Sequence, residues 1–140
     1  MSRSTKLTSA AYILSFIAAR GPKQVTTDTI AEALEDHPAR VRQIVAALVK
    51  AKLLKSVRGV NGGVVLARSA NDITLRDVFS AIEDQPILSL WMKDAYEGWG
   101  KSCLVHPILT SLINKMERDL ADQLSEVPIS ALYKRAAKSS

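Results

Sequence analysis

The segment of residues 58–63, Arg-Gly-Val-Asn-Gly-Gly, restricts the fold of this chain more than any other. It separates two β-prone runs, residues 53–58 and 64–68. An Asn-Gly pair between such runs is a strong signal for a β-hairpin, because both residues tolerate the positive φ angles of a tight turn. The glycines also lack side chains that would keep a phosphate away from the backbone. The segment therefore predicts a hairpin with a glycine-rich tip.

Three helices are predicted before this hairpin. Apolar residues at helical spacing indicate an amphipathic helix over about residues 5–20, followed by two shorter helices. Thr27 or Asp28 is expected to cap the second helix, and Pro38 suits the first turn of the third. Three helices with tight connections predict a helix-turn-helix, and the hairpin that follows makes it a winged helix.

Two more helices are predicted after the hairpin. We expect Thr74 to cap the first, while the second should begin at Pro107 and end at Pro128. A short segment, residues 129–133, then precedes a polar tail. The predicted fold class is mainly α with a small β-hairpin. The long helix has apolar residues at helical spacing, which are Ile108, Leu109, Leu112, Ile113, Met116, Leu120 and Leu124.

The charge of the chain is unevenly distributed. The net charge is +5, but the first 70 residues have 11 basic and 4 acidic side chains, whereas the last 70 have 8 and 10. Residues 38–70 include no acidic side chain. Such a basic block beside an apolar pattern indicates a surface that faces a polyanion, here double-stranded DNA. The alternative is a basic face that is merely solvated.

Several classes of protein are excluded or disfavoured. The single cysteine excludes an intrachain disulfide framework and a zinc site made of several cysteines. No apolar run approaches the ~18 residues that a membrane span needs, and the basic N-terminus does not continue into a signal peptide. We find no nucleophile–base pair, phosphate-binding loop or pair of catalytic carboxylates. A cytoplasmic protein that is not an enzyme and does not bind membranes is expected.

The third helix has the residue types that recognise base edges. Arg suits guanine, Gln suits adenine, and a small Ala permits close approach to DNA. Ordinary solvated positions on the helix are the alternative. The candidate residues on this helix are Ala39, Arg40, Arg42 and Gln43.

Further DNA contacts are expected from the hairpin and from the start of the first helix. The hairpin offers Lys55, Arg58, Asn61, Gly62 and Gly63 for the DNA backbone or the minor groove. A plain hairpin turn without a DNA contact is the alternative. At the start of the first helix, the candidate phosphate donors are Ser4, Thr5, Lys6 and Thr8.

Two consecutive motifs resemble the Rrf2 family of bacterial transcriptional regulators. Residues 54–68 match L-x-S-x-R-G-x-x-G-G-x-x-L-A-R, and residues 73–78 match I-T-L-x-D-V. The resemblance extends over about residues 7–84, and the helix from Pro107 fits the dimerisation helix of the family. It implies a homodimer in which the third helix enters the major groove and the wing touches the minor groove.

These observations predict a division of the chain and a function. Residues 1–84 would form the winged helix-turn-helix, residues 85–106 a sensor or connecting loop, and residues 107–140 the dimerisation helix and tail. The protein would be a DNA-binding repressor that acts as a homodimer on a palindromic operator. A protein-interaction module without DNA binding is an alternative. The expected dimer contacts are Ile108, Leu112, Ile113, Met116, Leu120 and Leu124.

The connecting loop holds the candidates for sensing. Many members of the family bind an iron–sulfur cluster through three cysteines, whereas this chain has Cys103 alone, so we expect no cofactor and no metal. Three alternatives remain for this cysteine: a packed or surface thiol with no role, a redox thiol near Lys101, or a metal ligand together with nearby His106 and a carboxylate. Trp91 and Trp99 line a small-molecule site or simply pack on the core. A redox or small-molecule effector is therefore a further expected partner.

Overall fold

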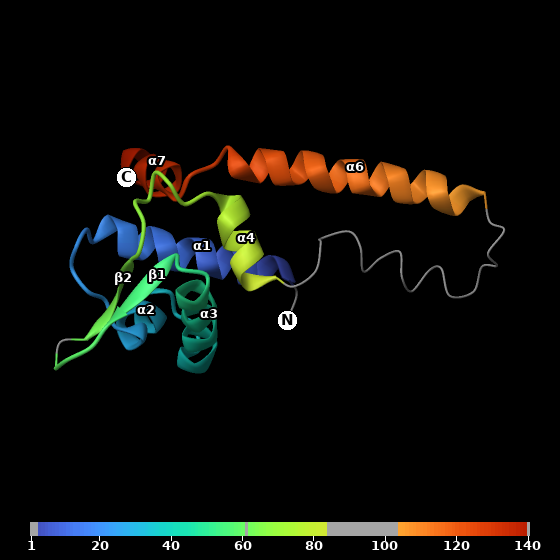
Figure 1. Ribbon diagram of the computed structural model, residues 1–140. Coiled ribbons are helices and arrows are strands. Elements are labelled where there is room, and N and C mark those ends of the chain that lie inside the picture. The colour runs from blue at the N-terminus through green and yellow to red at the C-terminus, as the bar shows by residue number, and fades with distance from the viewer. Residues whose placement is uncertain (1–2, 61, 84–103, 140) are drawn as a thin grey trace.

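The structure is a computed structural model, and it describes residues 3–60, 62–83 and 104–139. Most of the elements cluster around helix α1, while a long helix, α6, extends away from this cluster (Figure 1). The chain forms a winged helix-turn-helix, as predicted. In chain order the elements are α1 Arg3–Ala19, α2 Thr27–Ala33, α3 Pro38–Lys50, β1 Leu54–Val57, β2 Gly63–Leu66, α4 Leu75–Ile82, α6 Val105–Ser125 and α7 Ile129–Ser139.

Helix α1 is the centre of the core. Its side chains Ile13, Leu14 and Ile17 are completely buried, and the helix packs against α3, α4, α7 and β2. In Figure 1, α7 lies above α1 and α3 lies below it. The predicted helix is present, and Ala10, Ile13, Leu14 and Ile17 form its buried stripe. Thr5, Lys6 and Thr8 are exposed, so one face of α1 lies in the core and the other begins at the surface.

The helix ends follow the capping chemistry of their sequences, with one correction. Thr26, rather than Thr27 or Asp28, caps α2, because its hydroxyl accepts a hydrogen bond from the Thr29 N–H at 3.1 Å. His37 caps α3 through Nδ1, which accepts from the Ala39 N–H at 3.1 Å. Pro38 then occupies the first turn of α3, as predicted.

The hairpin is antiparallel, and a third segment joins it. β1 and β2 pair from Leu54 opposite Leu66 to Val57 opposite Gly63. Val25, which precedes α2, exchanges two backbone hydrogen bonds with Val64, at 3.1 and 2.8 Å. This bridge, which the sequence analysis did not predict, anchors the wing to the helix-turn-helix.

The glycines of the wing have two different roles. The positive φ of the turn lies at Gly59, with a value of 130°, and not at Gly62 of the Asn-Gly pair. Gly63 has no positive φ, but a Cβ at this position would lie 2.6 Å from the carbonyl oxygen of Val25. Gly63 is therefore required by the close approach of two backbones.

The C-terminal part of the chain differs from the prediction. Helix α6 begins at Val105, two residues before Pro107, and residues 129–139 form helix α7 instead of a short segment and a tail. The buried Ile129 and the half-buried Leu132 attach α7 to the core. None of the described helices is long and apolar enough to cross a lipid bilayer.

The first prediction tests whether α7 is part of the core. Ile129→Ala should lower the free energy of unfolding by about 2–5 kcal/mol, because it removes a completely buried side chain. Urea unfolding measures the change. Val60→Ala is the control, since Val60 is fully exposed and should change stability little. Equal stability of the two variants would contradict the place of α7 in the core.

Candidate nucleic-acid interface

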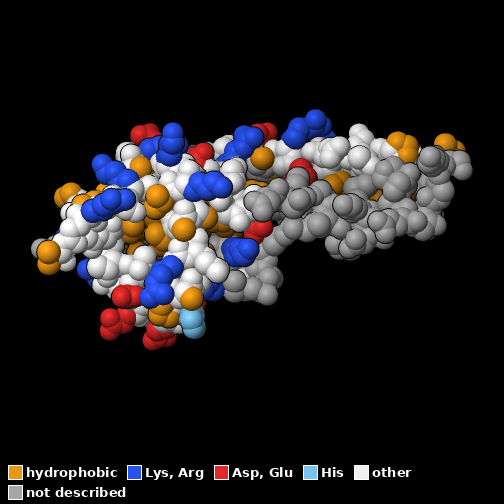
Figure 2. Space-filling model, turned by 60° about the horizontal axis from the view of Figure 1, so that its bottom comes forward, with side chains coloured by type: hydrophobic (Ala, Val, Ile, Leu, Met, Phe, Trp, Pro, Cys, Tyr) orange, Lys and Arg blue, Asp and Glu red, His pale blue; other side chains and the backbone are white. Residues whose placement is uncertain are grey.

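Basic side chains cover much of the winged-helix part of the molecule. Figure 2 shows Lys and Arg side chains over this part, with Asp and Glu side chains gathered along its lower edge. The basic surface is thus interrupted by acidic groups. The exposure and the ion pairs of each basic side chain determine whether it can contact DNA.

The outer face of α3 presents three of the four residues predicted for this helix. Ala39, Arg42 and Gln43 are exposed. Val41 and Ile44 lie on the opposite side and are buried in the core. The side chains available for base edges therefore lie together on one accessible helix face.

Arg40 is placed differently from the other three residues. Its side chain is only 18% exposed and forms an ion pair with Asp36, one helical turn earlier. Its Nε and Nη2 atoms are buried without a hydrogen-bond partner. Arg40 precedes the buried Ile44 by four residues, so it lies at the edge of the buried stripe. The opposite charges at positions 36 and 40 were the sequence signal for this pairing.

Arg42 forms a much looser pair. Its Nη2 lies 3.4 Å from Oδ1 of Asp28 on α2, and the two side chains are 59% and 78% exposed. Exposed pairs of this kind contribute only about 0–1 kcal/mol. The guanidinium of Arg42 is therefore accessible to a stronger anionic or base partner.

The wing places its basic residues at the surface. Lys55 and Arg58 are exposed, whereas Gly62 and Gly63 are half-buried. Asn61 lies outside the described residues. The side chain of Val60, which the sequence analysis did not single out, is fully exposed at the tip of the wing.

The start of α1 lies apart from the wing. Thr5, Lys6 and Thr8 are exposed in its first two turns, and the side chain of Ser4 is outside those described. In Figure 1 this end of α1 lies toward α4, away from the tip of β1 and β2. The structure therefore separates these residues from the wing.

The apolar stripe of α6 divides into two halves. Ile108, Leu112 and Met116 are at least half exposed. The other half of the stripe is half-buried and consists of Ile113, Leu120 and Leu124. Leu104, Val105 and Leu109, which were not among the predicted dimer contacts, extend the exposed half.

A second apolar surface lies between α1, α4 and α7. It is a hollow of about 570 Å³ that no motif in the sequence indicated. Tyr12, at its rim, is 59% exposed. The apolar side chains around the hollow include Leu7, Tyr12, Phe16, Leu75, Leu132 and Tyr133.

The sensing candidates cannot be placed. Cys103, Trp91 and Trp99 lie outside the described residues, as does most of the predicted loop of residues 85–106. Within the described part of the chain, no three His, Cys, Asp or Glu side chains come close enough to hold a metal ion. The roles considered for Cys103 therefore stay predictions from the sequence.

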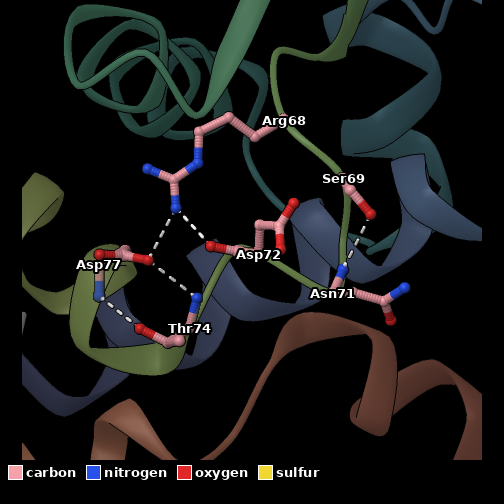
Figure 3. A network of polar contacts seen from close by, with 6 residues as sticks. All are labelled: Arg68, Ser69, Asn71, Asp72, Thr74 and Asp77. Atoms are coloured by element: carbon pink, nitrogen blue, oxygen red, sulfur yellow. Dashed lines mark hydrogen bonds and ion pairs between the residues drawn. The ribbon is translucent and has the colours of Figure 1, made fainter.

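A network of polar contacts joins the end of the wing to α4 (Figure 3). Arg68 Nη2 donates to the Asp77 carboxylate at 3.0 Å and also to the carbonyl oxygen of Asp72. Asp77 accepts from the Thr74 N–H at 3.0 Å, and the Asp77 N–H donates to the Thr74 hydroxyl at 3.3 Å. The predicted cap at Thr74 is thus confirmed as a reciprocal capping box.

This network lowers the pKa of Asp77. Partial burial by itself would raise that pKa, but the hydrogen bonds from Thr74 and the nearby Arg68 guanidinium outweigh it. The carboxylate is therefore stabilised in its charged form.

A helix-turn-helix with an exposed face on its second helix, followed by a wing, defines a winged-helix DNA-binding protein. The chain belongs to the Rrf2 family: the family model, described as an iron-dependent transcriptional regulator, matches residues 3–135. A relative from Lactococcus lactis, named "Putative HTH-type transcriptional regulator YffB", is 34% identical over 127 residues, which cover 84% of this chain and 78% of YffB.

Solved structures show the same fold. IscR of T. potens has a TM-score of 0.76 and 25% identity, covering 100% of this chain and 91% of IscR. CymR of B. subtilis has a TM-score of 0.73 and 21% identity, covering 96% of this chain and 98% of CymR. These relatives are transcriptional regulators and not enzymes, in agreement with the prediction.

The residues of this chain do not fit an iron–sulfur cluster. Such clusters are normally held by several thiolates, and one chain offers only Cys103.

The second prediction concerns the pH dependence of stability. Because the pKa of Asp77 is lower in the folded than in the unfolded state, the ionised carboxylate stabilises the folded protein fully above the ordinary aspartate pKa of about 3.9. This stabilisation is lost as the pH falls through the lowered pKa of the folded state. Urea unfolding of wild type and Asp77→Asn between neutral and strongly acidic pH measures this loss. The difference in stability between the two proteins should shrink on acidification, and a constant difference would contradict the assignment.

Proposed function

We propose that this protein is a transcriptional repressor that binds a palindromic operator as a homodimer. The observation that carries the proposal is the accessible face of α3, where Ala39, Arg42 and Gln43 lie opposite the buried stripe. A helix held in this way can enter the major groove, because its inner face is fixed by the core and its outer face is free. Selection of bound sites from random duplex DNA tests the proposal, which requires a palindromic motif.

The contacts divide into two classes. Arg42 and Gln43 are proposed to recognise base edges, and Ala39 permits the helix to approach them closely. Arg40 is proposed to support α3 through its pair with Asp36, since its side chain is largely covered. The proposed contacts to phosphates or the minor groove are Lys55, Arg58, Asn61, Gly62 and Gly63 from the wing and Thr5, Lys6 and Thr8 from α1.

Two uncovered apolar surfaces support a homodimer. Ile108, Leu112 and Met116 expose one side of α6, and Tyr12 projects beside the hollow between α1, α4 and α7. Apolar surface of this extent is stabilised by a partner, and a two-fold dimer is the commonest arrangement. The half-buried Ile113, Leu120 and Leu124 then support the α6 face from within the subunit.

A two-fold dimer also accounts for a symmetric operator. Two recognition helices separated by about 34 Å would meet successive major grooves on one side of the duplex. We infer repression because a dimer bound in this way would exclude polymerase from overlapping DNA without any further contact. Transcription from a template that carries the selected site should decrease as the protein is added.

The third prediction separates base contacts from phosphate contacts. Arg42→Ala should cost about 1–3 kcal/mol on the selected site and relax the preference at one base pair. Arg58→Ala should weaken binding to all sequences and lower the slope of log K against log salt by about 1. Equilibrium binding to selected and random duplexes at several salt concentrations measures both effects.

A matched control accompanies these two variants. Arg118→Ala removes the same charge from the exposed surface of α6, away from the winged helix, and should change DNA affinity little. If all three variants bind the selected and random duplexes alike, the assignment of α3 to the major groove is wrong.

The fourth prediction concerns assembly. Leu112→Asp should convert the dimer into a monomer, because it would bury a carboxylate in an apolar contact. Sedimentation measures the mass, and binding to the palindromic site should weaken at the same time. Asn114→Asp introduces the same charge at another exposed position of α6 and should remain dimeric. A wild-type protein that is monomeric at micromolar concentration would contradict the proposal.

A further inference from the structure

Arg68 follows the outgoing strand of the wing, and its side chain points toward Asp77 of α4 (Figure 3). Its guanidinium bridges two acceptors, the carboxylate of Asp77 and the backbone carbonyl of Asp72. Asp77 is itself held by the capping box with Thr74. At the base of the hairpin, the Ala67 N–H donates a hydrogen bond to the Leu53 carbonyl at 3.0 Å.

Arg68 contacts α4, which packs against the helices that bear the other proposed functional residues. Helix α4 packs against α1, against α3, which bears the proposed base contacts, and against α6, which bears the proposed dimer contacts. A connection from the wing to the start of α4 therefore fixes the wing relative to both α3 and α6.

The C-terminal segment is attached at the same place. The Leu75 N–H donates to the Val127 carbonyl at 2.9 Å, and the Ile129 N–H donates to the Ile73 carbonyl at 2.8 Å. Thr74, the capping residue, forms a backbone bridge with Pro128. The link between α6 and α7 therefore lies directly against the residues that hold Arg68 and Asp77.

We propose that Arg68 is a positioning residue for DNA binding, which orients the wing through Asp77 instead of touching DNA. The proposal rests on the DNA interface described above. With Arg68 and Asp77 joined, the wing keeps a fixed angle to α3 while α3 occupies the major groove. Because Thr74 is bridged to the link between α6 and α7, the same contact makes the wing position depend on the placement of the dimer helix.

A direct phosphate contact by Arg68 is the competing explanation, and Asp77 distinguishes the two. Removal of the Asp77 charge raises the net charge of the chain by one, which by itself strengthens binding to a polyanion. If Arg68 is instead held in place by Asp77, the same change weakens binding. The two explanations thus predict opposite signs for Asp77→Asn.

The experiment compares Arg68→Gln, Asp77→Asn and the double variant with wild type on the selected palindromic site. Oδ2 of Asp77 accepts from both the Thr74 N–H and the Arg68 guanidinium. An Asn amide oxygen in its place retains the helix cap, while loss of the negative charge weakens the contact with Arg68. Arg76→Gln is the matched control, because Arg76 is an exposed charge on α4 outside the network. Measuring affinity at 25 °C on protein shown to be folded by circular dichroism separates positioning from loss of stability.

We expect each single variant to bind about 3- to 30-fold more weakly than wild type, with an unchanged salt slope. The double variant should be no weaker than the weaker single variant, because both substitutions weaken the same contact. Unchanged affinity in either single variant would overturn the proposal. So would a salt slope lowered by about 1 in Arg68→Gln together with tighter binding by Asp77→Asn, which would make Arg68 a phosphate contact.

A measurement without DNA keeps this proposal separate from the proposed function. Amide hydrogen exchange in β1 and β2 should be faster in Arg68→Gln and in Asp77→Asn than in wild type, while exchange in the core of α1 stays unchanged. Unaltered exchange in the hairpin would overturn the proposal. Failure of the wild-type protein to select any DNA would overturn the proposed function alone.

Discussion

The packing of apolar residues around α1 is the interaction on which the other features depend. α3, α4, α7 and β2 all contact this helix, and its side chains Ile13, Leu14 and Ile17 are completely buried. The inner face of α3 is fixed by this core, so its outer face has a defined direction. The wing is fixed by β2 and by the Val25–Val64 bridge. The separate elements of the proposed DNA-binding surface are thus held in one geometry by one core.

The basic residues of this surface differ in how firmly they are held. Arg40 is covered and paired with Asp36, Arg68 is shared between two acceptors, and Arg42 has only a loose contact with Asp28. A guanidinium with weak partners loses little when it moves to a base or a phosphate, whereas a covered one would leave an unpaired charge behind. Accessibility and pairing, more than charge alone, distinguish candidate contacts from supporting residues.

Membership of the Rrf2 family gives this chain a fold and a regulatory class, but its cysteine content separates it from a cluster-binding regulator. One thiolate per chain does not supply the ligand set of an iron–sulfur cluster. The wing, α3 and α6 are nevertheless connected, through α4 and the paired backbone of residues 73–75 and 127–129. Under the proposal made for Arg68, a displacement of α6 would reach the wing through these contacts.

The sequence by itself determined the winged helix, the family and the cap at Thr74, because turn glycines, helical periodicity and capping act over a few neighbouring residues. It also marked Arg42 and Gln43 for the outer face of α3. Only the tertiary structure decided that α1 is covered on several sides, that residues 129–139 form a helix and that Arg40 is covered. It likewise decided that Gly63 is required by its contact with Val25 and that Arg68 joins the wing to Asp77. The covering of α1 and the contact of Gly63 with Val25 depend on segments that are distant in the chain and adjacent in space, which local patterns do not encode.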